Sequence, residues 1–239
     1  MKNMCPAFVQ KVPAAFLLVS LLLATTLANG QSRQRWSFGP RLGLNLTNFV
    51  GTSYSAATQA DANFNKLAPG VSAGVGFIYS DVSRFGFAID LLYAQRGSLS
   101  TGAGNTRTSR VNYLEIPITA RYFLTRSGNF RPNLYAGIVP ALRLNGFFRV
   151  KDANSDGRTN TTDLYRTADL GLTAGFQANF RAGDRQRFTV DLRYTQGITN
   201  ISIPVSDVRN QQITIGLGYN FGIGRQYRPG DRKLPLRDR

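Results

Sequence analysis

The sharpest local signal for chemistry is an acidic stretch with a central glycine, DANSDGRTNTTDL, at residues 152–164. Its oxygen-bearing residues stand where a twelve-residue calcium loop takes its ligands, and its glycine stands at the turn position of such a loop. The six candidate ligands are Asp152, Asn154, Asp156, Arg158 (through its carbonyl), Asn160 and Asp163. Exposed turns favour the same residue types, and no helix is expected on either side. A calcium loop and an ordinary surface turn both stay open, and the sequence suggests no cofactor besides calcium.

Catalytic chemistry is harder to find, because the chain has no histidine. Histidine is the commonest general base and the commonest ligand of transition metals. The single cysteine, Cys5, precedes an apolar run near the N-terminus. We therefore nominate no catalytic residue and expect that the protein is not an enzyme.

Residues 1–30 have the features of a secretory signal peptide. Lys2 and Lys11 precede the apolar run at residues 14–24, and small residues, Ala28 and Gly30, follow it. The run is too short for a membrane helix, which needs about 20 residues. We expect cleavage after Gly30, which removes Cys5 and leaves an exported chain without disulfides.

The remaining chain alternates apolar and polar residues in eight stretches, each long enough to cross hydrocarbon as a tilted strand. The expected strands are 35–47, 71–80, 85–96, 111–123, 130–145, 168–180, 188–197 and 212–222. Long polar connections (48–70, 97–109, 146–163 and 198–210) alternate with short basic ones (81–84, 124–129 and 181–187). This regularity predicts an up-and-down antiparallel meander. Only Tyr113 and Leu114 break the alternation, which suggests a bulge there or the membrane edge.

The two faces of these strands differ sharply. One face is apolar, as at Leu42, Ile89 and Leu192, and the other carries many glycines and ten charged residues: Arg41, Asp90, Arg96, Glu115, Arg121, Arg131, Arg143, Asp169, Asp191 and Arg193. A soluble, lipocalin-like ligand carrier would bury the apolar face. Aromatic residues, however, collect on that face beside the short connections, as in a membrane-interface girdle. The sequence therefore favours an all-β, eight-stranded antiparallel transmembrane barrel with lipid outside.

A barrel of eight strands has an interior that side chains just fill. We expect the charged residues to pair inside it, with Arg41, Asp90, Glu115, Asp191 and Arg193 in a middle layer. Arg96, Arg143 and Asp169 are expected above them. A purely structural plug is the favoured interpretation, and a proton or ion path is the alternative.

Two motifs give the chain a resemblance to a known family. The stretch YLEIPITARYF (113–123) and the last strand TIGLGYNF (214–221) resemble the PorT-like outer-membrane β-barrel domain proteins of Gram-negative bacteria, and more distantly the OmpA and OmpX barrels. The resemblance spans residues 36–222. It implies location in the cell outer membrane and a signal for the barrel-assembly machinery at Thr214, Gly216, Tyr219 and Phe221. The chain departs from the family in continuing beyond Phe221.

The expected organisation is a signal peptide (1–30), a barrel (31–223) and a basic periplasmic tail (224–239). The tail suggests binding to peptidoglycan or lipid phosphate, or a merely solvated segment. The basic long connections suggest contact with outer-membrane lipid and lipopolysaccharide. Nucleic acid is not an expected partner of an exported chain, although the formal net charge is +16.

The favoured function is a structural or interaction barrel with its external loops as the binding surface, and a protein is among the suggested partners. The alternative is a narrow porin-like channel. An outer-membrane enzyme and a soluble lipocalin-like carrier are less favoured.

Overall fold

The computed structural model describes residues 35–51, 67–80, 84–102, 105–125, 129–152, 155–183, 186–204 and 206–223. Ten strands and one short 3-10 helix lie in these ranges. The strands are β1 (Arg35–Val50), β2 (Ala68–Ser80), β3 (Phe85–Gly102), β4 (Asn105–Glu115), β5 (Ile118–Phe123), β6 (Asn133–Lys151), β7 (Asp156–Asn160), β8 (Ala168–Arg181), β9 (Gln186–Gly197) and β10 (Arg209–Ile223). The helix, η1, spans Thr162–Leu164.

Strands β4 and β5 are two halves of one crossing strand. Only Ile116 and Pro117 separate them, and the ladder continues through this break. Ile116 donates its backbone N–H to the Pro140 carbonyl at 2.9 Å, and the Pro117 carbonyl accepts the N–H of Asp90 at 3.0 Å. Proline has no N–H to donate, which accounts for the interruption.

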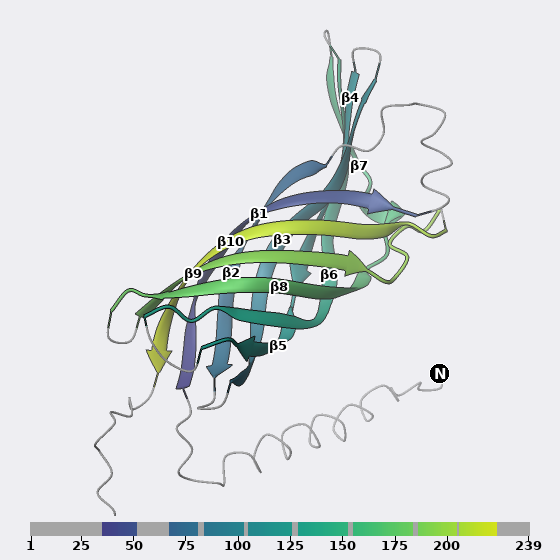
Figure 1. Cartoon of the computed structure of the whole chain (residues 1–239). Helices are drawn as coiled ribbons and strands as arrows, with labels where there is room; N and C mark the ends of the chain where they lie inside the picture. The colour runs from purple at the N-terminus through teal and green to yellow at the C-terminus, as the bar shows by residue number, and fades with distance from the viewer. Residues whose placement is uncertain are drawn as a thin grey trace, which may run out of the picture. The chain divides into compact units, whose positions relative to one another are not determined.

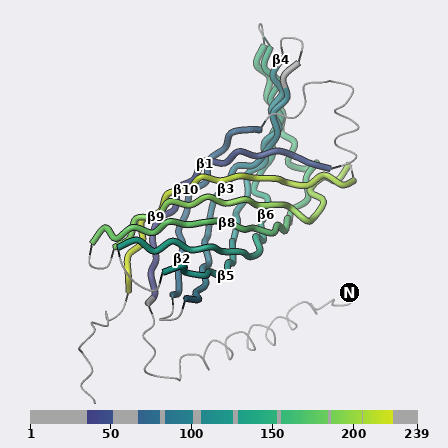
Figure 2. The backbone as a smooth tube through the Cα atoms, viewed as in Figure 1, coloured from purple at the N-terminus to yellow at the C-terminus, as the bar shows by residue number. Residues whose placement is uncertain are grey.

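The strands close into a ring, which Figures 1 and 2 show from the side. The order around it is β1, β10, β9, β8, β6, β4 with β5, β3 and β2, and β2 pairs with β1 to complete the circle. Every pairing in the ring is antiparallel. The eight-stranded antiparallel barrel predicted from the sequence is confirmed.

The barrel is apolar outside and charged inside. Leu42 is 62% exposed and Leu192 is 54% exposed, whereas Asp90 and Arg96 are each 1% exposed. This is the reverse of a soluble ligand carrier, whose charged face would meet water. The outward surface has the composition of a surface that contacts acyl chains.

Aromatic rings form the expected girdle at the rim of short connections. Ring centroids lie 4.8 Å apart between Trp36 and Tyr79, and 5.3 Å apart between Phe85 and Tyr122. Such rings are most stable at the depth of lipid headgroups. No helix among the described residues is long and apolar enough to span a membrane.

Two of the expected long loops, 97–109 and 146–163, are largely strand, so that part of the prediction is wrong. Strands β3, β4 and β6 continue past the ring, and β7 pairs with β6 there. The four strands form an antiparallel sheet, which rises beyond the other strands in Figure 1. We call this sheet, residues 97–102, 105–112, 146–151 and 156–160, the tongue. Its two faces are both largely polar, so its sequence lacks the apolar alternation that marks the other strands.

The irregularity in the fourth crossing strand is a bulge in its ladder with β6, as the sequence suggested. Tyr113 is fully buried and points into the lumen like Glu115, and the alternation through β4 is unbroken. The register shifts in the partner strand instead. Asn112 pairs with Asn145 but Tyr113 pairs with Arg143, so Leu144 is the extra residue of a bulge in β6.

Replacement of Leu192 by Arg tests which solvent the outer face meets. We expect Leu192→Arg to lower the free energy of unfolding by about 2–4 kcal/mol, because a charge then faces the middle of the bilayer. Denaturant unfolding of the barrel in phospholipid vesicles measures this change. Ile203→Arg is the matched control, because Ile203 is 62% exposed but lies in the 198–208 connection. Equal effects of the two substitutions would contradict a lipid-facing wall.

Candidate functional site

The lumen holds a layer of charges centred on Asp90 of β3. The carboxylate of Asp90 lies 3.8 Å from Arg41 Nε and 3.3 Å from Arg193 Nη2. Arg193 Nη2 also lies 3.4 Å from Asp191 Oδ2, and the Tyr135 hydroxyl donates to Asp191 Oδ1 at 2.6 Å. Strands β1, β3, β6 and β9 therefore meet through one chain of ion pairs and hydrogen bonds, which we call the lower layer.

A second group of charges, the upper layer, centres on Arg96, also from β3. Arg96 donates to Glu115 Oε1 at 2.7 Å and to Asp169 Oδ2 at 2.8 Å. Asp169 accepts further hydrogen bonds from Asn210 at 2.8 Å and from Thr199 at 2.6 Å. Glu115, expected in the middle layer, therefore belongs to the layer above.

Two other arginines have partners that differ from the expected ion pairs. Arg143 donates to the backbone carbonyls of Thr162 and Tyr165, because that segment folds back towards the lumen. Arg121 donates to Gln177 Oε1, and its guanidinium lies 5.1 Å from the ring centroid of Tyr135. Sequence reasoning missed these uncharged partners, although Tyr135 and Gln177 lie on the same strand face as the charged residues.

Two glycines make room for the lower layer. A Cβ at Gly76 would overlap Asp90 Oδ1 and Arg41 Nε, and a Cβ at Gly218 would overlap Arg41 Nη1. These two glycines thus make room for Arg41, whose guanidinium group occupies the space of the missing side chains.

One small cavity lies between side chains of the lower layer. Its volume is about 20 Å³, and Arg41, Asp90 and Arg193 are among its lining residues. Such a volume holds about one water molecule. Within each of the two layers, side chains pair with each other across the described lumen.

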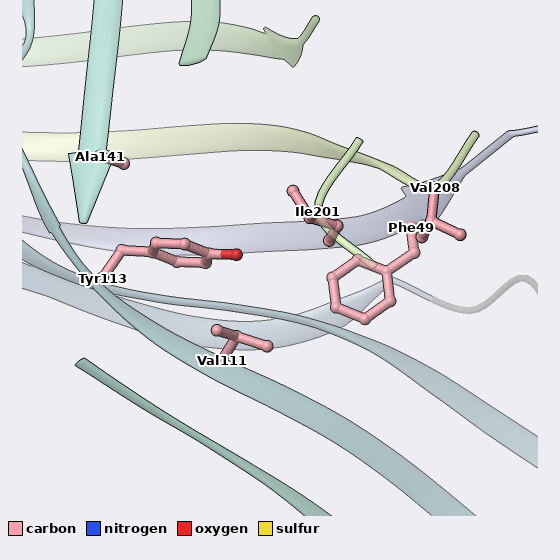
Figure 3. Packing of buried hydrophobic residues seen from close by; sticks show 6 residues of the cluster. All are labelled: Phe49, Val111, Tyr113, Ala141, Ile201 and Val208. Carbon is pink, nitrogen blue, oxygen red and sulfur yellow. The ribbon is translucent and has the colours of Figure 1, made fainter. Parts of the chain in front are cut away.

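An apolar cluster packs against the upper layer, where Arg96 lies 5.2 Å from the ring centroid of Tyr113. Figure 3 shows its members, Phe49, Val111, Tyr113, Ala141, Ile201 and Val208. Ile201 and Val208 come from the 198–208 connection, and Ile201 is fully buried. Residues from the loop side thus reach inward and pack between the strand ends.

Backbone hydrogen bonds hold these residues in place. Arg166 N donates to the Ile201 carbonyl at 2.7 Å, and Ile203 N donates to the Leu164 carbonyl at 2.9 Å. The Tyr165 hydroxyl lies 2.5 Å from Ser109 Oγ of the tongue. We call residues 161–167, 198–204 and 206–208 the cap. It is an ordered surface over the long-connection rim of the barrel.

The expected calcium-loop conformation is wrong for most of its residues. Asp156 to Asn160 form β7, whose backbone pairs with β6, and Asp163 lies in η1. An extended strand sends alternate side chains to opposite faces, so these residues do not wrap around one point. Asn154 lies outside the described residues, which hold no group of three or more acidic, His or Cys residues placed to bind a metal.

Asp156 instead pairs with Arg149 across the tongue, where Arg149 Nε donates to Asp156 Oδ1 at 2.7 Å. This hydrogen bond lowers the pKa of the exposed Asp156 carboxyl. Calcium binding at this hairpin stays a prediction.

The expected assembly-signal residues all lie in β10. Thr214 donates to Asn45 Oδ1 at 3.0 Å inside the barrel, and Gly216 lies beside Asp191. The rings of Tyr219 and Phe221 meet at the girdle, 5.0 Å apart. Their role in assembly stays a prediction, and the expected signal peptide (1–30) and basic tail (224–239) lie outside the described residues.

The sequence matches the family model of the outer membrane protein beta-barrel domain over residues 28–202. The chain belongs to this family. Membership places the barrel in the outer membrane of a Gram-negative bacterium. In such barrels the short turns are periplasmic and the long connections external.

Several solved outer-membrane barrels have a similar architecture. The Neisserial surface protein A shares 13% identity, with 77% of this chain and 96% of that chain covered and a TM-score of 0.44. Ail of Yersinia pestis, solved with the heparin analogue sucrose octasulfate, shares 13% identity over 78% and 99% of the two chains, with a TM-score of 0.42. The outer membrane protease OmpT of Escherichia coli shares 7% identity over 80% and 96%, with a TM-score of 0.38. No curated protein matches the chain.

Replacement of Asp90 by Asn tests the lower layer. We expect Asp90→Asn to lower the free energy of unfolding by about 3–5 kcal/mol, because Arg41 and Arg193 then lose the carboxylate that balances them in the lumen. Denaturant unfolding in phospholipid vesicles measures the loss. Asp156→Asn is the control, since it breaks an ion pair on the exposed tongue and should change stability little. A stable Asp90→Asn barrel would show that the pairs do not hold the lumen together.

Proposed function

We propose that this protein is a non-conducting outer-membrane barrel that anchors an external binding surface made of the cap and the tongue. The observation that carries the proposal is the pairing of side chains across the lumen beneath the cap. Two charged layers and an apolar cluster occupy the interior. The surface available for binding a partner is therefore the external one, made of the cap and the tongue.

The cap also presents apolar side chains to the outside. Leu164 is 49% exposed and Ile203 is 62% exposed, and a backbone hydrogen bond joins the two residues. Apolar side chains held on an ordered surface suit contact with a protein partner. A protein partner at this surface is therefore part of the proposal.

A narrow channel is the second candidate, because ten charged residues share the lumen face. It would require movement of the arginines and of Ile201, which now fill the path. An enzyme is the least supported role, since the chain lacks histidine and the lumen carboxylates are held in ion pairs.

Three further parts of the proposal rest on sequence. The stretch at 113–123 supports membership of the PorT-like group within the family. A signal peptide cleaved after Gly30, and recognition of β10 by the barrel-assembly machinery, account for export and insertion. The basic tail at 224–239 suits an anionic periplasmic partner such as peptidoglycan.

Single-channel recording in planar lipid bilayers tests the closed lumen. We expect the purified barrel to give no steady conductance steps, because the side chains leave no continuous water path. A large porin recorded in the same bilayers shows that steps are detectable. Uniform steps from this barrel would contradict the proposal and favour the channel.

Cysteine labelling on intact cells tests which surface is external. The mature chain is expected to have no cysteine, so one introduced thiol reports one site. We expect a membrane-impermeant maleimide to label Arg158→Cys on intact cells. The matched variant Thr125→Cys, at the short-turn rim, should react only after the outer membrane is permeabilised. The opposite labelling pattern would show that the tongue faces the periplasm and the short turns face outward.

A further inference from the structure

The tongue has one strongly basic face. Cross-strand pairing aligns Leu99, Thr108, Arg149 and Arg158 in one row, and the pairing of Arg110 with Phe147 places these two residues in the row below. Residues two apart on a strand share a face. The outward face therefore carries four basic residues and one acid: Arg110, Arg149, Lys151, Arg158 and Asp156. Arg107 lies on the opposite face.

Side-chain contacts agree with this division. The guanidinium of Arg158 lies 3.9 Å from the ring centroid of Phe147, and Arg149 bonds to Asp156, so these four residues share a face. On the other face, Ser109 meets Tyr165 of the cap. One face of the tongue thus contacts the cap, and the basic face is the opposite one.

The basic face continues the lipid-facing wall. Strand β4 runs from outward Leu114 through Asn112 to Arg110, whose guanidinium donates to Gln95 Oε1 at 3.3 Å. Gln95 in turn donates to the hydroxyl of Tyr93, an outward residue that is 37% exposed. Arg110 therefore marks the boundary where the apolar wall ends and positive charge begins.

The bulge at Leu144 determines this arrangement. Leu142 and Leu144 both face outward, each 49% exposed, and the extra residue changes the alternation in β6. Arg149 and Lys151 consequently join the outward face. Without the bulge, the apolar Phe148 and Val150 would take their place.

We infer that this basic face binds the phosphate groups of lipid A, the phosphorylated glycolipid anchor of lipopolysaccharide, in the surrounding outer leaflet. Phosphates of that lipid lie just beyond the acyl chains, and Arg110, Arg158 and Lys151 follow the apolar wall in successive rows of the tongue. Arginine is suited to phosphate because its planar fork donates two parallel hydrogen bonds. The inference rests on the proposed external position of the tongue and names one partner for that surface.

The test compares two arginines of the same sheet. The full mature barrel in detergent is titrated with bisphosphorylated lipid A, and native mass spectrometry counts the bound lipid. We expect Arg158→Gln to weaken binding about fivefold, the typical contribution of one basic residue at an anionic lipid surface. Lys151→Gln combined with Arg158→Gln should weaken it about twentyfold or more. Arg107→Gln removes the same charge from the other face and should stay within about twofold.

Three outcomes would overturn the inference. Equal losses for Arg107→Gln and Arg158→Gln would show that only total charge matters. Undiminished binding of dephosphorylated lipid A would show that phosphate is not recognised. If soluble inositol hexakisphosphate displaced lipid A at the same concentration as the lipid, the basic face would be assigned to a soluble polyanion. Cysteine labelling of Arg158→Cys is independent of these results, so a failed orientation and a failed lipid contact can be told apart.

Discussion

The hydrocarbon of a membrane offers no hydrogen-bond partners, and this constraint governs the whole barrel. Each backbone N–H and C=O group that crosses it must be paired within the protein, which requires a sheet that closes on itself. The ring from β1 around to β2 meets that requirement, including the stretch at Pro117 where neighbouring carbonyls continue the ladder. Once the ring is closed, apolar side chains meet lipid and the polar face is confined to a narrow interior.

That interior explains why the lumen contains arginine and glycine together. A guanidinium group is long and always charged, so it must find carboxylates or other acceptors and also space. Asp90, Glu115, Asp169 and Asp191 supply the carboxylates, while glycines such as Gly218 supply the space. The same ion pairs that bring these charges together also cross the lumen. Binding at the external surface of the cap and the tongue is then favoured over passage through the lumen.

The outer surface depends on two local features. The 198–208 connection folds inward because Ile201 and Val208 find an apolar pocket between the strand ends, and this orders the cap. The bulge in β6 changes which residues of the tongue face outward. An interaction surface is thus built partly by apolar packing and partly by one extra residue in a strand.

The sequence by itself determined the architecture, because a lipid-facing strand must alternate apolar and polar residues and must have a minimum length. All eight crossing strands, the inverted faces and the aromatic girdle follow from that pattern. It also identified the charged residues of the lumen, since they share one face. It did not determine their partners: Glu115 joins Arg96, and Arg143 bonds to backbone carbonyls, because pairing depends on strand register and on how the cap folds back. The sequence did not predict the tongue, because a sheet with polar residues on both faces has no alternation of apolar and polar residues. Which basic residues lie on the outward face of the tongue was decided by the bulge at Leu144. Only the tertiary structure shows that shift, because the extra residue is defined by the strand opposite it.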